Sequence, residues 1–212
     1  MGVHEPITKA EIEKAGATGV CAGAQVRTPV GNKRIEFLRK GDLVVTRDNG
    51  LQPVRMVWTR TVTEAQMAAD PSLAPVVLRP RAIAPMQPQR DLAVGGAHRL
   101  LIPGWRLLDE DDGEACLVPA RDIAGLDDRA FVDRTTGDVT FYNVVFDGAE
   151  VFTANGLPVE SFRPTVEMIG QVDRAVRDDI LAQLDATGSK PSDFPAPRYK
   201  LRERVSYSPD FA

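Results

Sequence analysis

The sequence predicts an all-β domain with helical segments at both ends. Short runs of alternating apolar and polar residues recur between about residues 24 and 162. Turn residues separate these runs at roughly 8- to 12-residue intervals, the spacing of an all-β domain, and no helical period persists within the region. With 212 residues and 43% hydrophobic composition, the chain can bury one core, or one core with an appendage.

A short helix is predicted before this region, over residues 7–16. The stretch 8–11 fits a capping box, in which a Thr hydroxyl and a Glu side chain satisfy free backbone amides at the start of the helix. Gly16 and Gly19 then favour its end, because glycine stops helices readily.

Two hairpins are predicted next, each with alternating runs on either side of a turn. Asn-Gly in the second turn is the strongest short signal for a hairpin. The paired runs are 26–29 with 33–37 around a turn at 30–32, and 43–46 with 54–58 around a turn at 47–50.

Further strands are predicted at 76–79, 91–94, 99–102, 116–118, 130–133, 139–146 and 150–154, with a short inserted helix at 63–70. From Val166 to Leu184, apolar residues recur at intervals of three and four, which predicts an amphipathic helix over 166–187 that ends at Gly188. The Pro-rich, polar stretch 189–212 is expected to form a tail, either packed on the domain or partly disordered.

Composition argues against several classes of partner. A net charge of -4 and a pI near 5.3 give no general attraction to nucleic acid or to anionic membranes. The basic strip 27–60 is most simply a solvated face. No segment has the length of a membrane span or the apolar region of a signal peptide, so we expect a cytoplasmic location by default. Two cysteines make no disulfide framework, which fits a reducing compartment.

One cysteine and one histidine stand out. Cys21 lies in Thr-Gly-Val-Cys-Ala-Gly, and His98 follows 77 positions later in Gly-Gly-Ala-His-Arg. A thiol among small residues, with an imidazole far away in sequence, is suited to attack on a carbonyl, and the nearest carbonyl is that of Val20. A structural interpretation stays open, because free cysteine is a common core residue and a buried histidine can be satisfied by backbone groups.

Five segments resemble those of a known family, in the same order. They are 21–31, 38–55, 95–101, 117–122 and 146–162. The first two resemble the start of the Hint domain, the module shared by hedgehog autoprocessing domains and inteins, and most closely its bacterial hedgehog/intein-like branch. The third is similar to the histidine block of the family, and the last to its terminal strand pair.

The resemblance implies a disc-like all-β fold with pseudo-twofold halves, in which Cys21, His98 and the segment 150–161 come together. It covers about residues 19–164. The chain is therefore expected to consist of an N-terminal extension at 1–18, a Hint-like domain at 19–164, and a C-terminal helix and polar tail at 165–212.

The activity that the resemblance implies is autoproteolysis in cis. Cys21 would attack the Val20 carbonyl and convert the amide into a thioester, an N–S acyl shift. His98 would act as the acid for the Cys21 nitrogen. Water or another external nucleophile such as a thiol would then take the acyl group, so that the chain's own N-terminal segment is the substrate. No cofactor is implied.

Four residues depart from the family pattern. Gly95 stands where the family has a Thr or Ser that contacts the scissile amide, and loss of one such donor costs about 3 kcal/mol, or about a hundredfold in rate. Glu160 and Ser161 stand where inteins end in His-Asn, so cleavage by asparagine cyclisation is not expected. Ala149 replaces another histidine.

Several other polar residues are weaker candidates. Asp91, Asp147 and Glu160 could orient His98 or activate a water, although solvated or turn-capping roles are simpler. Cys116 begins an apolar strand and is expected in the core. A metal site is not expected, because Cys21, Cys116, His4 and His98 contain none of the closely spaced ligand pairs that zinc sites use.

Two other functions stay open. A catalytically degraded Hint fold would act as a binding or structural module, with the basic strip 27–60 and the helix 166–187 as its surfaces. A thiol hydrolase for external esters or peptides would need an open cleft beside Cys21.

Overall fold

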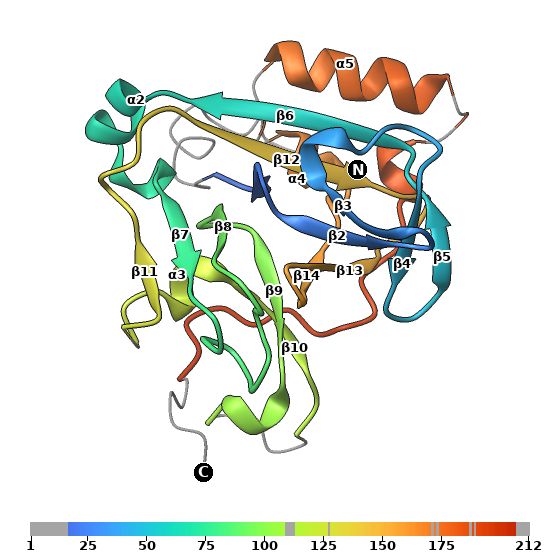
Figure 1. Cartoon of the computed structure of the whole chain (residues 1–212). Coiled ribbons are helices and arrows are strands. Elements are labelled where there is room, and N and C mark those ends of the chain that lie inside the picture. Colours follow the sequence, from blue (N-terminus) through green and yellow to red (C-terminus); the bar gives the residue numbers. More distant parts are fainter. Residues whose placement is uncertain are drawn as a thin grey trace, which may run out of the picture.

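The computed structural model describes residues 17–108, 113–126, 128–170, 172, 174–186, 188 and 190–206. The predicted helix over 7–16 lies outside these residues. The predicted all-β class is confirmed: the strands form two antiparallel sheets, with only short helices between them (Figure 1).

In the first sheet, the first strand of the described chain is an interior strand with a neighbour on each side. Its six strands follow the order β11 (Ala130–Val132), β7 (Pro75–Leu78), β8 (Leu92–Gly95), β1 (Val20–Cys21), β12 (Val139–Val145) and β6 (Met56–Val62). In β1, Val20 lies opposite Val94 of β8 on one side and opposite Tyr142 of β12 on the other. The two-residue strand is therefore paired on both edges, which is the arrangement that holds the candidate site.

The second sheet contains the remaining strands. Along its main path lie β10 (Cys116–Pro119), β9 (Arg99–Ile102), β14 (Leu157–Glu160), β13 (Val151–Ala154), β2 (Gln25–Thr28) and β3 (Gly31–Arg34). Two further strands branch from this path: β4 (Leu43–Thr46) pairs with β13 and with β5 (Gly50–Pro53). The terminal pair β13–β14 is the one that the resemblance implied.

The second predicted hairpin is wrong in its second arm. The partner of β4 is β5, which begins at Gly50 inside the predicted turn, and Thr46 lies opposite Gly50. Gly50 has a φ of +65°, a conformation that glycine adopts without strain, so the chain reverses immediately before it. The segment predicted as the second arm belongs instead to β6, which pairs with β12 along its whole length.

The short helices follow local capping signals. In α2 (Glu64–Ala69), Thr63 and Gln66 form a complete capping box, which confirms the predicted inserted helix. The helix α3 (Ala120–Ile123) follows β10. The described residues also include four 3-10 turns: η1 (Ile35–Phe37), η2 (Pro71–Leu73), η3 (Gly104–Arg106) and η4 (Pro191–Asp193).

The predicted continuous helix over 166–187 is wrong. The structure has two helices, α4 (Val166–Gly170) and α5 (Arg174–Asp185), and α5 lies across β6 at the top of Figure 1. Glycine favours a helix end at residue 170. The guanidinium of Arg177 donates hydrogen bonds to the carbonyls of Ile169 and Gly170, at 3.2 and 3.1 Å, and so satisfies groups that the end of α4 leaves free. The predicted apolar face is retained, because Ile180 packs with Trp58 in a buried cluster.

The polar tail is packed on the domain as far as residue 206. Leu201 forms an isolated parallel bridge with Leu117 of β10. The hydroxyl of Tyr199 donates to Asp48 at 2.9 Å and accepts from Arg47 at 3.1 Å. These contacts attach the tail to the second sheet.

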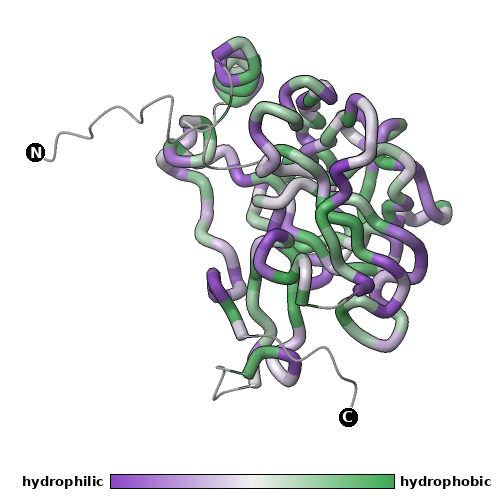
Figure 2. The backbone as a smooth tube through the Cα atoms, turned by 90° about the vertical axis from the view of Figure 1, so that its left-hand side faces the viewer, coloured by the Kyte–Doolittle hydropathy of each residue, from purple (hydrophilic) through white to green (hydrophobic). Residues whose placement is uncertain are grey.

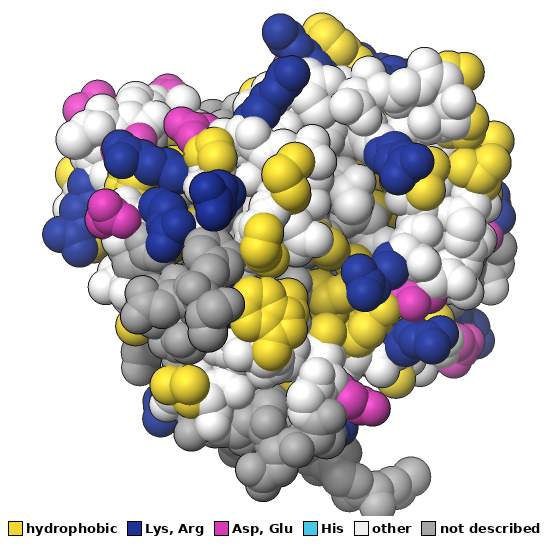
Figure 3. Space-filling model, turned by 60° about the horizontal axis from the view of Figure 1, so that its bottom comes forward, with side chains coloured by type: hydrophobic (Ala, Val, Ile, Leu, Met, Phe, Trp, Pro, Cys, Tyr) yellow, Lys and Arg dark blue, Asp and Glu magenta, His cyan; other side chains and the backbone are white. Residues whose placement is uncertain are grey.

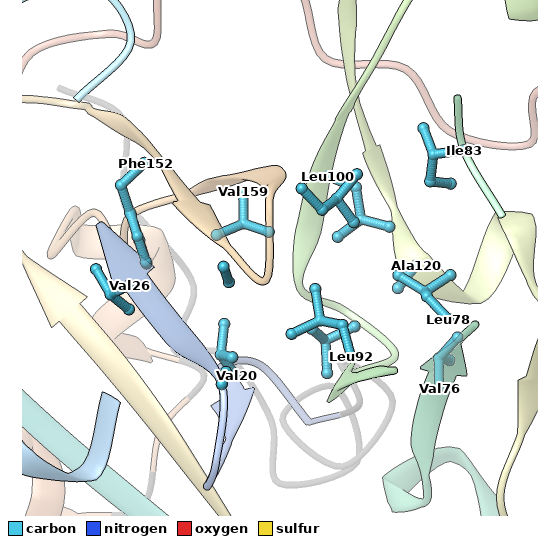
Figure 4. Packing of buried hydrophobic residues seen from close by; sticks show 14 of the residues in the cluster. Val20, Val26, Val76, Leu78, Ile83, Leu92, Leu100, Ala120, Phe152 and Val159 are labelled. Carbon is cyan, nitrogen blue, oxygen red and sulfur yellow. The ribbon is translucent and has the colours of Figure 1, made fainter. Parts of the chain in front are cut away.

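Buried side chains of both sheets form one main hydrophobic cluster. Val20 lies among these side chains in Figure 4, near Leu92 of the first sheet and Val159 of the second. Figure 2 shows hydrophobic stretches running through the body of the molecule and hydrophilic stretches at many of its outer bends. The residue before Cys21 is thus part of the core that joins the sheets.

The surface carries both signs of charge. Figure 3 shows hydrophobic side chains at the centre of the face seen from below, with basic and acidic side chains around them. Among the described residues, no helix combines the length and the apolar character that a membrane crossing requires.

We predict that Gly95→Ala destabilises the protein, because an added Cβ would lie 2.2 Å from the Ala17 carbonyl oxygen. Crowding of this kind costs about 1–3 kcal/mol. Gly96→Ala is the matched control, since its Cβ would meet no atom closer than 3.6 Å. Urea denaturation measures both variants. Equal midpoints for the two variants would show that the chain before β1 is not held against β8.

Candidate active site

The Val20–Cys21 peptide is embedded in the first sheet. Val20 has no exposed surface, and Cys21 lies opposite Phe141 of β12. The carbonyl of Gly19 accepts a hydrogen bond from the Gly95 N–H at 2.9 Å, toward β8. Because successive residues of a strand direct their backbone groups to opposite neighbours, the Val20 carbonyl faces β12.

The thiol of Cys21 is in an apolar environment. It is partly buried and packs against a cluster that includes Ala17, Val139 and Phe141. Burial raises the pKa of the Cys21 thiol to about 12, because a thiolate would lose its hydration there. The thiol is therefore protonated at neutral pH, and attack on a carbonyl requires removal of its proton.

Cys21 lines a cleft of about 480 Å³. Asp91, Asp133 and Arg79 supply charged groups to the same cleft, and the guanidinium of Arg79 lies 5.2 Å from the ring centroid of Phe131. The structure thus places Asp91 at the same cleft as Cys21, and the cleft has room for water or a small nucleophile.

His98 contacts the backbone two residues before Cys21. Its side chain is 5% exposed, and Nδ1 accepts a hydrogen bond from the Gly19 N–H at 3.3 Å. The hydroxyl of Thr18 lies 3.5 Å from the same nitrogen. Burial, and then the charge of Arg99, lower the pKa of His98 to about 3, so the imidazole is neutral. The ring therefore contacts the Gly19 nitrogen in this structure, whereas the family resemblance implies a role at the Cys21 nitrogen.

Asn143 completes the surroundings of the same peptide. Its Nδ2 donates a hydrogen bond to the Thr18 carbonyl oxygen at 3.2 Å. The Thr18–Gly19 peptide therefore has an amide donor on its oxygen and an imidazole on its nitrogen. Sequence reasoning missed both Thr18 and Asn143. One signal was available for Asn143, which shares the alternation of the buried residues Phe141 and Val145 in β12.

Two glycines make this packing possible. Gly19 has a φ of +114°, and a Cβ added to it would lie 2.7 Å from Asn143 Nδ2. At Gly95, the Ala17 backbone occupies the space that a side chain would need. The hydroxyl that the family resemblance implies at position 95 therefore has no room while residues 17–19 lie here.

The remaining candidate residues fall into two groups. Glu160 and Ser161 line a cavity of about 10 Å³ together with His98 and Thr18. Glu160 accepts from Arg99 and Arg163, at 3.2 and 2.8 Å.

The other residues lie elsewhere. Asp147 is exposed and forms a two-point ion pair with Arg55. Cys116 is fully buried in the main cluster, as predicted. Within the described ranges, no three His, Cys, Asp or Glu side chains are grouped so that they could hold a metal ion.

Three solved structures of intein-like proteins are similar to this chain. A bacterial intein-like domain from Clostridium thermocellum is 15% identical, with a TM-score of 0.47 over 68% of this chain and 99% of that chain. The gp41-1 intein is 15% identical, with a TM-score of 0.39 over 68% and 97%. The MchDnaB-1 intein (N145AA) is 11% identical, with a TM-score of 0.41 over 68% and 99%.

Among curated proteins, none matches this sequence. Residues 18–166, more than half of the chain, match the family described as the Hint domain. The chain therefore belongs to the Hint domain family.

Proposed function

We propose that this protein is a self-processing domain that cleaves its own backbone at Val20–Cys21 by an N–S acyl shift. One observation carries the proposal: Val20 is fixed in the sheet and core, while the adjacent residue, Cys21, lines a cleft of about 480 Å³. The Val20 acyl group is thus held rigidly beside the Cys21 thiol. Water or an external thiol can reach the resulting thioester from the cleft.

The proposed step exchanges one bond for another. Cys21 Sγ attacks the Val20 carbonyl carbon, the bond from that carbon to the Cys21 nitrogen breaks, and the thiol proton ends on the released amine. The carbonyl faces the backbone of β12, whose N–H groups are suited to support the developing oxyanion. Attack by water or an external thiol then frees the thiol of Cys21 and releases the N-terminal segment.

Asp91 is the carboxylate that we assign to this step. It lines the same cleft as Cys21 and could accept the thiol proton or orient the incoming water. His98 contacts the Gly19 amide, so a role at the Cys21 nitrogen would need a shift of the entering strand.

A second candidate function is a Hint fold that no longer cleaves and serves as a binding or structural module. It is favoured because His98 and Asn143 contact the Thr18–Gly19 peptide and not the Val20–Cys21 peptide beside the thiol. Position 95 also has no room for the hydroxyl that the family pattern places there.

We predict that the wild-type protein loses the segment ending at Val20, faster with dithiothreitol or hydroxylamine, and that Cys21→Ala does not. A thioester is opened readily by such nucleophiles, and alanine cannot form one. Intact mass spectrometry of freshly expressed protein measures this. Cys116→Ala is the control, because that thiol is fully buried elsewhere in the core. If the mass of every variant stays unchanged in every buffer, self-cleavage is excluded and the binding or structural module is the remaining function.

We also predict that cleavage at Val20–Cys21 accelerates with pH. The pKa of the Cys21 thiol is raised to about 12, so the thiolate is a minor species at neutral pH. Below that value, its fraction increases about tenfold for each pH unit, and the rate should follow. Timed mass spectra across alkaline buffers test this. A rate that reaches a plateau near neutral pH would contradict attack by this buried thiol.

A further inference from the structure

The C-terminal arm, defined here as residues 198–206, lies along the edge of the second sheet. The strand β10 ends the order of that sheet, and Leu201 of the arm forms a parallel bridge with Leu117 of β10. The Leu117 N–H donates to the Lys200 carbonyl at 2.9 Å, and the Leu117 carbonyl accepts from the Arg202 N–H at 3.0 Å. In Figure 1 this red segment runs past β10 toward α3. The arm therefore satisfies backbone groups that an edge strand would leave unpaired.

The side chains of the arm alternate as in a strand. Tyr199 and Leu201 are partly buried and pack against a small hydrophobic cluster that includes Leu117. Val205 is also partly buried and packs against the main core. The residues between these three are exposed. The edge of β10 thus accepts an extended segment with apolar side chains at alternate positions, and this pattern sets the register of the segment.

Carboxylates of the domain face basic side chains of the arm. Asp48 lies 3.6 Å from Arg198 Nε and also accepts a hydrogen bond from the Tyr199 hydroxyl at 2.9 Å. Glu114 lies 3.8 Å from Lys200 Nζ. Solvent reaches both ion pairs, so each contributes little to stability. Together they match the edge to a basic segment, because complementary charges suppress unsuitable partners.

A proline-rich connector, residues 190–197, joins the arm to the rest of the domain. Among the described residues, the hydrogen bonds of this connector stay within it, such as the one from the Asp193 N–H to the Lys190 carbonyl at 3.0 Å. Proline keeps a chain extended, so a connector of this length can span about 25 Å. The arm can therefore reach beyond its own domain.

Release of the arm would leave both sheets of the domain complete. The arm contributes one isolated bridge, and its apolar side chains are only partly buried. Segments with so few buried contacts open at a small fraction of the global free energy of unfolding. A second copy of the chain carries the same arm and the same edge, so an exchange of arms would reproduce each contact described above.

We propose that the edge of β10 is an interaction surface for a second copy of this chain, with which it exchanges C-terminal arms. Each copy places its arm on the partner's β10, and the resulting dimer has twofold symmetry. An extended, stiff connector lowers the effective concentration of the arm at its own edge. The exchanged dimer therefore competes with the closed monomer as the protein concentration rises.

The experiment cross-links the arm to the edge in the full-length wild-type protein. Unlabelled and nitrogen-15-labelled protein are mixed in equal amounts and incubated at high concentration until the dimer fraction is constant. A carbodiimide then couples Lys200 to Glu114, whose charged atoms are 3.8 Å apart. Monomer and dimer are separated by size exclusion, and mass spectrometry identifies the labels of the two cross-linked peptides.

The two fractions are expected to differ in these labels. In the monomer, both cross-linked peptides carry the same label, because the arm lies on its own domain. In the dimer, about half of the cross-links should join a labelled peptide to an unlabelled one, as random pairing of two equal populations with exchanged arms requires.

Two variants assign the contact. Leu201→Asp places a carboxylate in the apolar cluster and is expected to weaken the dimer at least about tenfold, because the arm then docks poorly on either copy. Val30→Asp is the matched control: Val30 is 97% exposed in the turn between β2 and β3, and its replacement should leave the dimer unchanged. Circular dichroism confirms that both variants are folded.

Several outcomes would overturn the proposal. A dimer that gives only same-label cross-links would be joined through another surface. Mixed cross-links that persist undiminished in folded Leu201→Asp would show that the arm does not hold the dimer. A protein that stays monomeric at every concentration would exclude a second copy as the occupant. If that monomer binds a free peptide with the sequence of residues 198–206, the edge serves a segment of another protein instead.

Discussion

The placement of residues 17–21 inside the first sheet is the constraint on which the site depends. A strand of two residues has few contacts of its own, and it is held because β8 and β12 pair with its two edges. The approach is close, since the Ala17 carbonyl occupies the place of a side chain at Gly95. The hydrogen bonds from Gly95 to Gly19 and from Ala97 to Ala17, both 2.9 Å, secure the segment before the strand. The segment around Val20–Cys21 is thus an integral part of the fold.

Burial of this segment also sets the protonation of the groups around it. The same desolvation raises the pKa of the Cys21 thiol and lowers that of His98, because each charged form would lose water. Both groups are therefore neutral at physiological pH. The lowered pKa makes the His98 imidazole a weak proton acceptor, and the raised pKa keeps the Cys21 thiol protonated, so burial disfavours the charged form of each group.

The cysteine and the histidine lie at different peptides. At Val20–Cys21, a thiol lies next to the bond and its residue lines a cleft. At Thr18–Gly19, Asn143 and His98 contact the bond and a water-sized cavity adjoins it. Membership of the Hint family is established by the match over residues 18–166.

The sequence by itself determined the all-β class, the family and most strands, because alternation, turns and ordered motifs are local signals that survive folding. It also indicated Cys21 and His98. Only the tertiary structure decided which strands pair, so that β4 takes β5 and β6 takes β12. It likewise decided that His98 faces Gly19, that Asn143 reaches Thr18, and that Asp147 pairs with Arg55. Those contacts join residues far apart along the chain, and their register depends on the close approach of backbones at Gly19 and Gly95, which no local pattern encodes.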